Sequence, residues 1–371
     1  MDEGPLGGAR PAEFWKPLAG GDISCLLCPH RCRIGPGKKG ICRVRVNEGG
    51  RLVLPFYGAI SGAGMDPVEK KPLYHFLPGT QVFSLGFVGC NLHCPFCQNW
   101  DISQSTESVA KRMEAEDVIK AARRSGSPSI AYTYSEPSVH YEFVLDCMRL
   151  ARESGIRNIL VTNGCLQAGP AAELLAMTDA ANVDLKCWSA ERYRKELGGD
   201  LDAVLGFIRE ASARCHLEVT TLVVPDLSDG SEDVAAIAAF LADLDPDIPL
   251  HLSAYHPAWR HRAPATDPDA LLELALVARR FLRYVYVGNL SGIESDTRCA
   301  GCGALLVRRR GYAVSVPGLG PAAIEVARGG PGRAARAAGA AAPSSSDPPK
   351  APWGPRPVIE QNHSFFSPKA H

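Results

Sequence analysis

A loop with three closely spaced cysteines places the strongest constraint on how this 371-residue chain can fold. The cysteines follow the pattern Cys90-x3-Cys94-x2-Cys97, directly after the apolar run 82–88 and Gly89. That run has the length of a buried strand, so we expect the cysteines on a loop at the carboxyl end of a strand. Parallel α/β sheets and barrels carry their chemistry at that end. The spacing therefore predicts a metal-binding loop on a parallel α/β scaffold.

Three thiolates on one short loop suit an iron–sulfur cluster, because cysteine sulfur is the usual ligand of iron in such clusters. A four-iron cluster normally takes four ligands, so three local cysteines would leave one iron free to bind another molecule. A zinc knuckle and buried structural thiols are the alternatives, and a lone Cys-x2-Cys would favour zinc. The third cysteine, the aromatic Phe96 and the preceding strand favour the cluster.

Composition limits the class of protein and its compartment. The chain is 46% hydrophobic, has 40 Lys and Arg against 40 Asp and Glu, and contains 13 cysteines. Balanced charge gives no support for a nucleic-acid or acidic-membrane partner. Residues 1–14 lack the basic and apolar regions of a signal peptide, and no apolar run reaches the roughly 18 residues that span a bilayer. We therefore expect a cytoplasmic protein whose clustered cysteines bind metal rather than form disulfides.

Two further groups of cysteines flank the central part of the chain. The motif Cys299-x2-Cys302 is either half of a zinc ribbon or a structural turn with two cysteines. The other group lies near the N-terminus and reads Cys25-x2-Cys28-x3-Cys32, followed by Cys42. This spacing is that of an all-cysteine zinc site or of a second iron–sulfur cluster, with free thiols as the alternative. His30 could replace one of its thiols. We call this group the N-terminal knuckle, and it comprises Cys25, Cys28, Cys32 and Cys42.

From residue 82 onward, apolar strand-like runs alternate with helical stretches. In the stretch 138–154, for example, apolar residues recur at helical spacing. Such alternation predicts parallel βαβ units. Six or seven strands are too few for an eight-fold barrel, so we predict an α/β fold with a partial (β/α)6 barrel. The expected strands are 82–88, 129–135, 158–162, 181–187, 218–224, 250–254 and 283–287, and the expected helices are 115–125, 138–154, 168–177, 189–213, 231–243 and 268–282.

Composition also divides the chain into five segments. Residues 51–60 read as a strand and 66–76 as a loop. In that loop Lys70, Lys71 and His75 could face the mouth of the cluster site, but we expect each at the surface. The last segment is rich in Ala, Gly, Pro, Arg and Ser, so it cannot bury enough apolar surface to order itself. The expected segments are a flexible lead-in at 1–20, a Cys-rich metal-binding region at 21–75, the partial barrel at 76–290, a CxxC-containing extension at 291–318 and a disordered tail at 319–371.

The pattern Cys-x3-Cys-x-aromatic-Cys resembles the signature of the radical S-adenosylmethionine (SAM) superfamily. The resemblance implies a [4Fe–4S] cluster held by Cys90, Cys94 and Cys97, whose free iron binds the amino and carboxylate groups of SAM. It also implies reductive cleavage of SAM to a 5′-deoxyadenosyl radical, which abstracts hydrogen from a substrate. The cofactor would supply the difficult chemistry, and the protein would position it. The superfamily fold is the partial barrel that the alternation of elements predicts.

Longer stretches resemble the AmmeMemoRadiSam-system radical SAM enzymes, a group related to pyruvate formate-lyase activating enzymes. The similarity covers roughly residues 23–317. It implies AMMECR-like and Memo-like proteins as candidate partners, and a flavodoxin-like or ferredoxin-like electron donor, but kinship does not fix the substrate. The stretches that carry it are CxLCPHxCxIxxGKxGxC, DPxEKKPLYHFxPG, GCNLHCPFCQNWDISQ, TYSEPSVHYE, VDLKCW, SAYHP, YVYVGN and the terminal CxxCG.

The resemblance further assigns five SAM contacts at strand ends. Asn99 lies two places past the last cluster cysteine, where an Asn contacts SAM, although Asn also favours helix N-caps. Glu136 matches the acid of a Gly-Gly-Glu-Pro-like stretch that holds the SAM ammonium group. Asp184 and Lys186 share one face of a strand and match a cation ligand and a SAM contact, with a buried ion pair as the alternative. His256 matches a His against SAM, and an ordinary strand-end histidine is its alternative.

Several positions depart from the family pattern. Tyr134 and Ser135 replace the glycines before Glu136, Val161 stands in place of an Asp, and no Arg lies near Thr220. We predict a radical SAM enzyme, activating-enzyme-like, whose product is a glycyl radical on a partner protein or a modified protein or small molecule. An iron–sulfur electron-transfer protein and a zinc-stapled binding scaffold are the alternatives.

Overall fold

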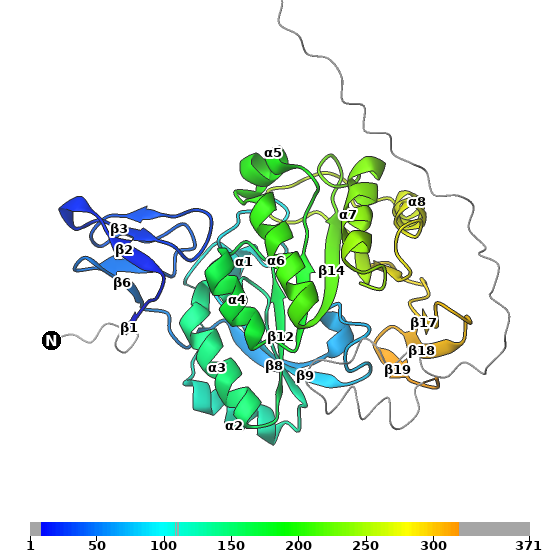
Figure 1. The fold of residues 1–371 in the computed structure, drawn as a ribbon, viewed down its shortest axis with the longest axis horizontal. Coiled ribbons are helices and arrows are strands. Elements are labelled where there is room, and N and C mark those ends of the chain that lie inside the picture. Colours follow the sequence, from blue (N-terminus) through cyan, green and yellow to red (C-terminus); the bar gives the residue numbers. More distant parts are fainter. Residues whose placement is uncertain (1–8, 108, 110, 319–371) are drawn as a thin grey trace, which may run out of the picture. The chain divides into compact units, whose positions relative to one another are not determined.

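A computed structural model describes residues 9–107, 109 and 111–318, which belong to one compact unit, Met1–Ala337 (Figure 1). The predicted tail at 319–371 lies outside the described residues, as does the start of the predicted lead-in. Residues 9–20 differ from the expected flexible lead-in, because they supply β1 (Arg10–Pro11), β2 (Trp15–Pro17) and a 3-10 turn at Ala19–Gly21. Trp15 pairs with Cys25, and Arg10 pairs with Leu54, so strand pairing anchors this part of the chain.

Within the described residues the largest sheet has eight strands in the order β16-β15-β14-β13-β12-β11-β9-β8. Seven of them are parallel, and β8 pairs antiparallel with β9 at one edge. The predicted partial barrel is confirmed, since six strand–helix units are followed by a last strand. The strands are β8 (Gly62–Pro67), β9 (Gln81–Gly86), β11 (Ser129–Thr133), β12 (Arg157–Thr162), β13 (Ala180–Asp184), β14 (His216–Val223), β15 (Leu250–Ala254) and β16 (Val285–Gly288).

Helices lie along the outside of this sheet (Figure 1). In α2, Ala115, Val118, Ile119 and Ala122 are buried, which is the one-sided apolar face that packs a helix on a core. The expected helix at 189–213 is instead broken before Asp200, whose carboxylate caps a new helix. The helices are α1 (Trp100–Ser103), α2 (Ala115–Arg124), α3 (Tyr141–Glu153) with a 3-10 turn at Pro137–His140, α4 (Ala168–Ala176), α5 (Ala190–Arg192) with a π turn at Tyr193–Leu197, α6 (Leu201–Arg214), α7 (Ser231–Leu244) and α8 (Pro268–Ala278).

The N-terminal knuckle sits among short antiparallel strands and is docked on the barrel by a buried ion pair. Arg45 donates to both carboxylate oxygens of Glu142, at 2.6 and 3.1 Å, and both side chains are buried. Its other hydrogen bond goes to the carbonyl of Glu13. The strands of this region are β1 (Arg10–Pro11), β2 (Trp15–Pro17), β3 (Ile23–Cys25), β4 (Arg33–Ile34), β5 (Val46–Glu48) and β6 (Arg51–Leu54), followed by β7 (Ala59–Ile60), which pairs with β10 (Lys111–Arg112).

The C-terminal extension packs against the amino end of the barrel through a buried arginine. Arg309 donates to the carbonyl of Tyr74, and its guanidinium lies 4.3 Å from the centre of the Tyr74 ring. Next to it, burial alone would raise the pKa of Glu218, but hydrogen bonds from His216 and His251 hold that pKa well below its usual range. The extension contains β17 (Thr297–Arg298), β18 (Leu305–Arg310) and β19 (Ala313–Ser315).

Of the three residues in 66–76 that we expected at the protein surface, two lie in the interior or partly in it. Lys71 is buried and pairs with Asp66 at 2.7 Å, and His75 is half-buried with its Nε2 2.7 Å from the hydroxyl of Tyr286. Only Lys70 of the three has a largely exposed side chain. The 3-10 turn at Val68–Lys70, which directly follows β8, turns this segment under the barrel. The expected surface positions of Lys71 and His75 were wrong because the barrel supplies partners for both polar groups, Asp66 for Lys71 and Tyr286 for His75.

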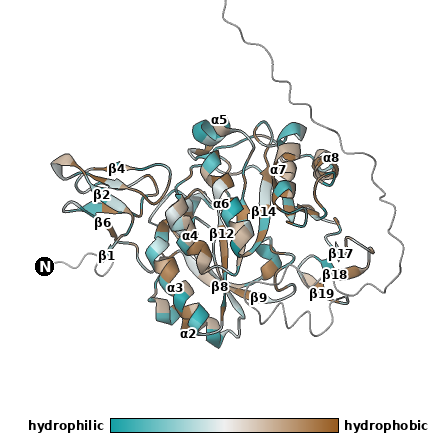
Figure 2. Ribbon diagram, in the orientation of Figure 1, coloured by the Kyte–Doolittle hydropathy of each residue, from teal (hydrophilic) through white to brown (hydrophobic). Residues whose placement is uncertain are grey.

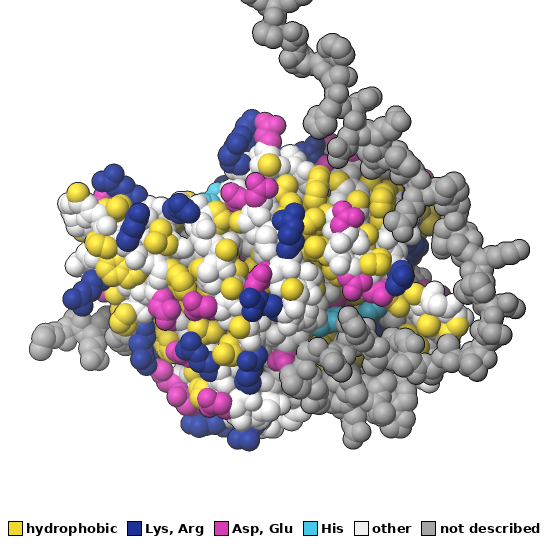
Figure 3. All heavy atoms as spheres, viewed as in Figure 1, with side chains coloured by type: hydrophobic (Ala, Val, Ile, Leu, Met, Phe, Trp, Pro, Cys, Tyr) yellow, Lys and Arg dark blue, Asp and Glu magenta, His cyan; other side chains and the backbone are white. Residues whose placement is uncertain are grey.

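The distribution of apolar and charged residues is that expected for helices packed on a central sheet. In Figure 2, helices α2 and α3 carry both brown and teal, as expected for elements with one buried face. Figure 3 shows basic and acidic side chains interspersed over the visible face, in keeping with the equal numbers of the two in the sequence. Among the described residues, no helix is both long enough and apolar enough to cross a membrane.

Candidate active site

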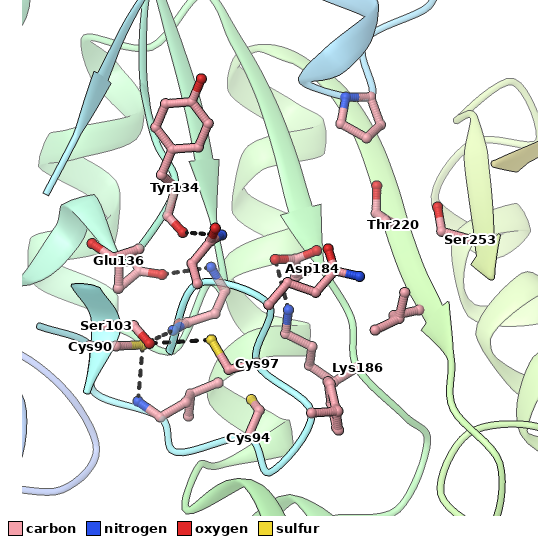
Figure 4. A pocket seen from close by; sticks show the side chains of 18 of the residues that line it. Cys90, Cys94, Cys97, Ser103, Tyr134, Glu136, Asp184, Lys186, Thr220 and Ser253 are labelled. Carbon is pink, nitrogen blue, oxygen red and sulfur yellow. Dashed lines mark hydrogen bonds and ion pairs between the residues drawn. The ribbon is translucent and has the colours of Figure 1, made fainter. Parts of the chain in front are cut away.

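The three cysteines of the loop after β9 open onto a cavity of about 300 Å³ (Figure 4). Each neighbouring parallel strand contributes to its wall at or near the strand's carboxyl end, which is where such sheets gather functional groups. The cavity wall includes Cys90, Cys94, Cys97, Gln98, Asn99, Ser103, Tyr134, Ser135, Glu136, Asn163, Asp184, Lys186, Thr220, Leu222, Ser253 and Asn289, together with Pro72, Leu92 and Phe96.

The three thiols have the surroundings of metal ligands. The backbone N–H of Leu92 donates to Cys90 Sγ at 3.3 Å, and Ser103 Oγ lies 3.2 Å from Cys97 Sγ. Burial raises the pKa of the Cys94 thiol to about 12 and raises that of Cys90 as well. Bound metal would have to displace these protons, because the thiolate is the ligand form.

This donor set fits a [4Fe–4S] cluster. In the described part of the chain, no group of three or more His, Cys, Asp or Glu side chains is arranged to hold a single metal ion. A cubane cluster makes a different demand, since each cysteine binds a separate iron and the sulfurs need not meet at one point. The three thiols line one cavity, and Cys90 and Cys97 each have a hydrogen-bonding group at the sulfur, so this donor set meets the demand.

Glu136 joins the carboxyl ends of two strands. Its Oε1 accepts hydrogen bonds from the Ser138 N–H at 3.0 Å and the Thr162 hydroxyl at 2.7 Å, and its Oε2 accepts the Asn163 N–H at 2.8 Å. Burial raises the pKa of this carboxyl. Glu136 therefore fixes the loops after β11 and β12 where they meet the cavity, and its predicted contact with SAM stays a prediction.

Asn99 and Tyr134 are held together across the cavity rim. Asn99 Nδ2 donates to the Tyr134 carbonyl at 2.7 Å, and Asn99 stands at the N-cap position of α1 without a capping hydrogen bond from its side chain. Tyr134 has a φ of 72°, a left-handed conformation that non-glycine residues seldom adopt. Figure 4 shows its ring directed away from the three cysteines. Its hydroxyl bonds to Asp66 inside the barrel.

Asp184 and Lys186 form the ion pair that the sequence offered as an alternative. Lys186 Nζ lies 2.8 Å from Asp184 Oδ2, and both side chains reach the cavity (Figure 4). Burial alone would lower the pKa of Lys186, but the charges of Asp184 and of a Cys94 thiolate raise it further than burial lowers it. Lys186 is therefore a charged ammonium group beside the cysteines.

The structure brings four of the five predicted SAM contacts to the cavity. His256 is exposed and is not among the residues that line the cavity. Sequence reasoning assigned no role to Ser103, Ser253 or Asn289, which do line it. The available signal for each was its place in a stretch that carries the family resemblance: Ser103 in GCNLHCPFCQNWDISQ, Ser253 in SAYHP and Asn289 in YVYVGN.

Comparison with known proteins agrees with the geometry. Residues 85–241 match the family model described as the Radical SAM superfamily. The chain is 40% identical over 307 residues to an uncharacterized protein of Methanocaldococcus jannaschii, a match that covers 81% of this chain and 91% of that protein. The chain therefore belongs to one family with that archaeal protein and contains a radical SAM superfamily domain at residues 85–241.

More distant relatives have named activities. A pyruvate formate-lyase-activating enzyme of Clostridium pasteurianum is 26% identical over 180 residues, covering 46% of this chain and 73% of the relative. A 7-carboxy-7-deazaguanine synthase of Methanothermobacter thermautotrophicus is 28% identical over 149 residues, covering 39% and 52%. Among solved structures, a domain of pyruvate-formate lyase-activating enzyme from Bacteroides vulgatus matches at 18% identity and a TM-score of 0.38, covering 43% of this chain and 98% of that one.

Proposed function

We propose that this protein cleaves SAM reductively at a [4Fe–4S] cluster held by Cys90, Cys94 and Cys97, and that the resulting radical takes hydrogen from a substrate. The observation that carries the proposal is the convergence of these thiols on a cavity that also holds the Asp184–Lys186 pair. When bound, the cluster would supply one electron to the sulfonium of SAM, giving methionine and a 5′-deoxyadenosyl radical.

The chain's own side chains suit the binding of SAM. Its methionyl end carries an ammonium and a carboxylate, and Asp184 and Lys186 offer the complementary charges from one wall. Asn99 adds an amide at the rim, and Glu136 keeps the ends of β11 and β12 in place. The cavity is partly enclosed by buried side chains, which limits the access of water to a reactive radical.

Partners and substrate extend this proposal. A flavodoxin-like or ferredoxin-like protein would deliver the electron, and AMMECR-like and Memo-like proteins are candidate partners. A relative is named pyruvate formate-lyase-activating enzyme. We therefore propose a protein substrate first, either a backbone glycine or another residue, and a small molecule second.

We also propose that the N-terminal knuckle binds a second thiolate-ligated metal centre, although its four described cysteines are not arranged in the structure as ligands of a single metal ion, so binding would have to draw them together. Burial raises the pKa of the Cys28, Cys32 and Cys42 thiols, and nearby backbone N–H groups oppose that rise, so they favour the thiolate form that a metal requires. The buried cation Arg45 lies beside the thiols and would balance part of their negative charge when they are ionised.

Product formation tests the main proposal. The protein is purified and reconstituted without oxygen, reduced, and incubated with SAM, and 5′-deoxyadenosine is measured by mass spectrometry. Wild type and the Cys215→Ala control should form it, because Cys215 lies outside the cavity, whereas Cys94→Ala should not. Absence of product from wild type with a full cluster, and an unchanged paramagnetic-resonance spectrum on adding SAM, would favour the electron-transfer alternative.

Metal analysis tests the knuckle and the remaining alternative. Cys28→Ala should lower the metal content by one centre while leaving the SAM-dependent cluster signal in place. Loss of zinc in that variant would identify a zinc site, and loss of iron with sulfide would identify a cluster. A wild-type protein that contains zinc and no iron after anaerobic reconstitution would support the binding scaffold and refute the enzyme.

A further inference from the structure

A buried hydroxyl touches one of the three cysteines. Ser103 is the last residue of α1, is only 2% exposed, and places its Oγ 3.2 Å from Cys97 Sγ. The Nε2 of Gln104 lies 3.4 Å from the same oxygen and 3.0 Å from the carbonyl oxygen of Leu92. Three groups therefore form one chain, from the Gln104 amide through the Ser103 hydroxyl to the sulfur.

The groups at the two ends of this series of hydrogen bonds decide which atom donates and which accepts. The Leu92 carbonyl can only accept, so the Gln104 atom that faces it is the NH2 group, which can only donate. Cys97 bound to iron is a thiolate and has no proton to give. The Ser103 hydroxyl therefore accepts from Gln104 and donates to Cys97 Sγ, and a hydroxyl that accepts one hydrogen bond becomes a better donor.

The position of Ser103 is fixed by α1, the short helix that follows Asn99. The Ser103 N–H donates to the Asn99 carbonyl at 2.9 Å, and the Ile102 carbonyl accepts the Gly89 N–H at 2.8 Å. Both ends of the three-cysteine loop are thus tied to α1. By comparison, the side-chain donor at Cys90 is longer, since Asn163 Nδ2 lies 3.7 Å from that sulfur.

We propose that Ser103, oriented by Gln104, donates a hydrogen bond to the Cys97 thiolate of the bound cluster and thereby raises the cluster's reduction potential. The inference rests on the proposed function, because it requires the cluster. Reduction adds negative charge to the cluster, and a hydrogen bond to a ligand sulfur stabilises the more negative state. Ser103 is then a positioning and tuning residue that sets how readily an external donor can reduce the site.

A redox titration without SAM tests the inference independently of activity. The midpoint potential of the reconstituted cluster is followed by paramagnetic resonance in wild type, Ser103→Ala, Ser103→Thr and Gln104→Ala. We expect Ser103→Ala to shift the midpoint to a more negative value, Ser103→Thr to stay near wild type because it keeps the hydroxyl, and Gln104→Ala to shift less in the same direction.

A matched control removes a buried hydroxyl elsewhere. Ser129 is fully buried at the amino end of β11 with no hydrogen-bond partner for its Oγ, so Ser129→Ala should keep the wild-type midpoint. A Ser103→Ala protein with a full cluster and the wild-type midpoint overturns the inference. If Ser103→Ala cannot retain iron, an unshifted midpoint in Gln104→Ala overturns it instead. A wild type that assembles no [4Fe–4S] cluster refutes the proposed function rather than this refinement of it.

Discussion

The substitution Gly89→Ala adds one methyl group and should disrupt the contact between Gly89 and the N-terminal knuckle. Gly89 immediately precedes the first cluster cysteine and has a φ of 77°. A Cβ added there would lie 2.4 Å from the carbonyl oxygen of Cys42 and 2.7 Å from Val44 Cγ1. Both distances are too short for real atoms, and the nearer partner is backbone, so Gly89→Ala must displace either the knuckle or the three-cysteine loop.

The expected loss in the free energy of unfolding of Gly89→Ala has two parts. A non-glycine residue in the left-handed region costs about 1–2 kcal/mol of the free energy of unfolding. Relief of the overlap by a backbone shift costs roughly another 1–3 kcal/mol, as overpacking does elsewhere. Gly89→Ala should therefore destabilise by about 2–5 kcal/mol. Gly126 has a nearly equal φ of 69° with open space around its Cα, so Gly126→Ala should lose only the first part.

Urea unfolding of the two variants, each compared with wild type, separates the cost of the left-handed backbone from the cost of the steric overlap. Iron analysis after anaerobic reconstitution measures the effect on the cluster. We expect Gly89→Ala to lose both more stability and more iron than Gly126→Ala. Equal losses of stability in the two variants would show that the close approach of the knuckle to Gly89 does not exist in solution, and the reasoning would fail.

Three further predictions concern buried ionisable groups. Glu142→Ala should destabilise by about 3–5 kcal/mol in urea unfolding because it leaves Arg45 buried and unpaired, whereas the double change Arg45→Met with Glu142→Leu should recover most of that loss. Burial lowers the pKa of His140 from 6.5 to about 4, so the neutral ring stabilises the fold above pH 6.5 and up to about 3 kcal/mol is lost as pH falls from 6.5 to 4; His140→Asn should flatten that slope, and an unchanged slope would contradict the assignment. Arg309→Met should lower the urea midpoint and expose the extension 291–318 to proteolysis, while its exposed neighbour Arg308→Met should do neither.

The alternation of strands and helices could be predicted because it depends on local periodicity. The expected strand 129–135 and helix 231–243, for example, agree with β11 and α7 to within two residues. Strand β8 could not be predicted in the same way. Its sequence GAGMDP has two glycines and a proline, and it becomes a strand because it pairs with β9 along six residues. Pairing with a distant partner overrides weak local preference.

The candidate site also contains residues that the sequence could identify and residues whose roles depend on contacts with distant parts of the chain. The three cysteines carry a spacing that reports their chemistry, so they could be found without a structure. The roles of Glu136 and Ser103 depend on which atoms meet them, namely the loop after β12 for one and Cys97 for the other. Lys71 was misplaced because a lysine is normally exposed, and only the barrel interior supplies the Asp66 carboxylate that makes its burial tolerable.

The N-terminal knuckle and the three-cysteine loop share a physical boundary. The Cys42 carbonyl packs on Gly89, and His30 Nε2 lies 2.7 Å from the Asn91 carbonyl, so contacts from the knuckle fall on residues on either side of Cys90. Loss of order in the knuckle would therefore free the backbone that positions a cluster ligand. Because α1 holds the same loop from the other side through the Ile102 carbonyl, Cys90 is positioned by two elements that are distant in sequence. A metal centre in the knuckle would then support the three-cysteine loop even without any exchange of electrons between the two.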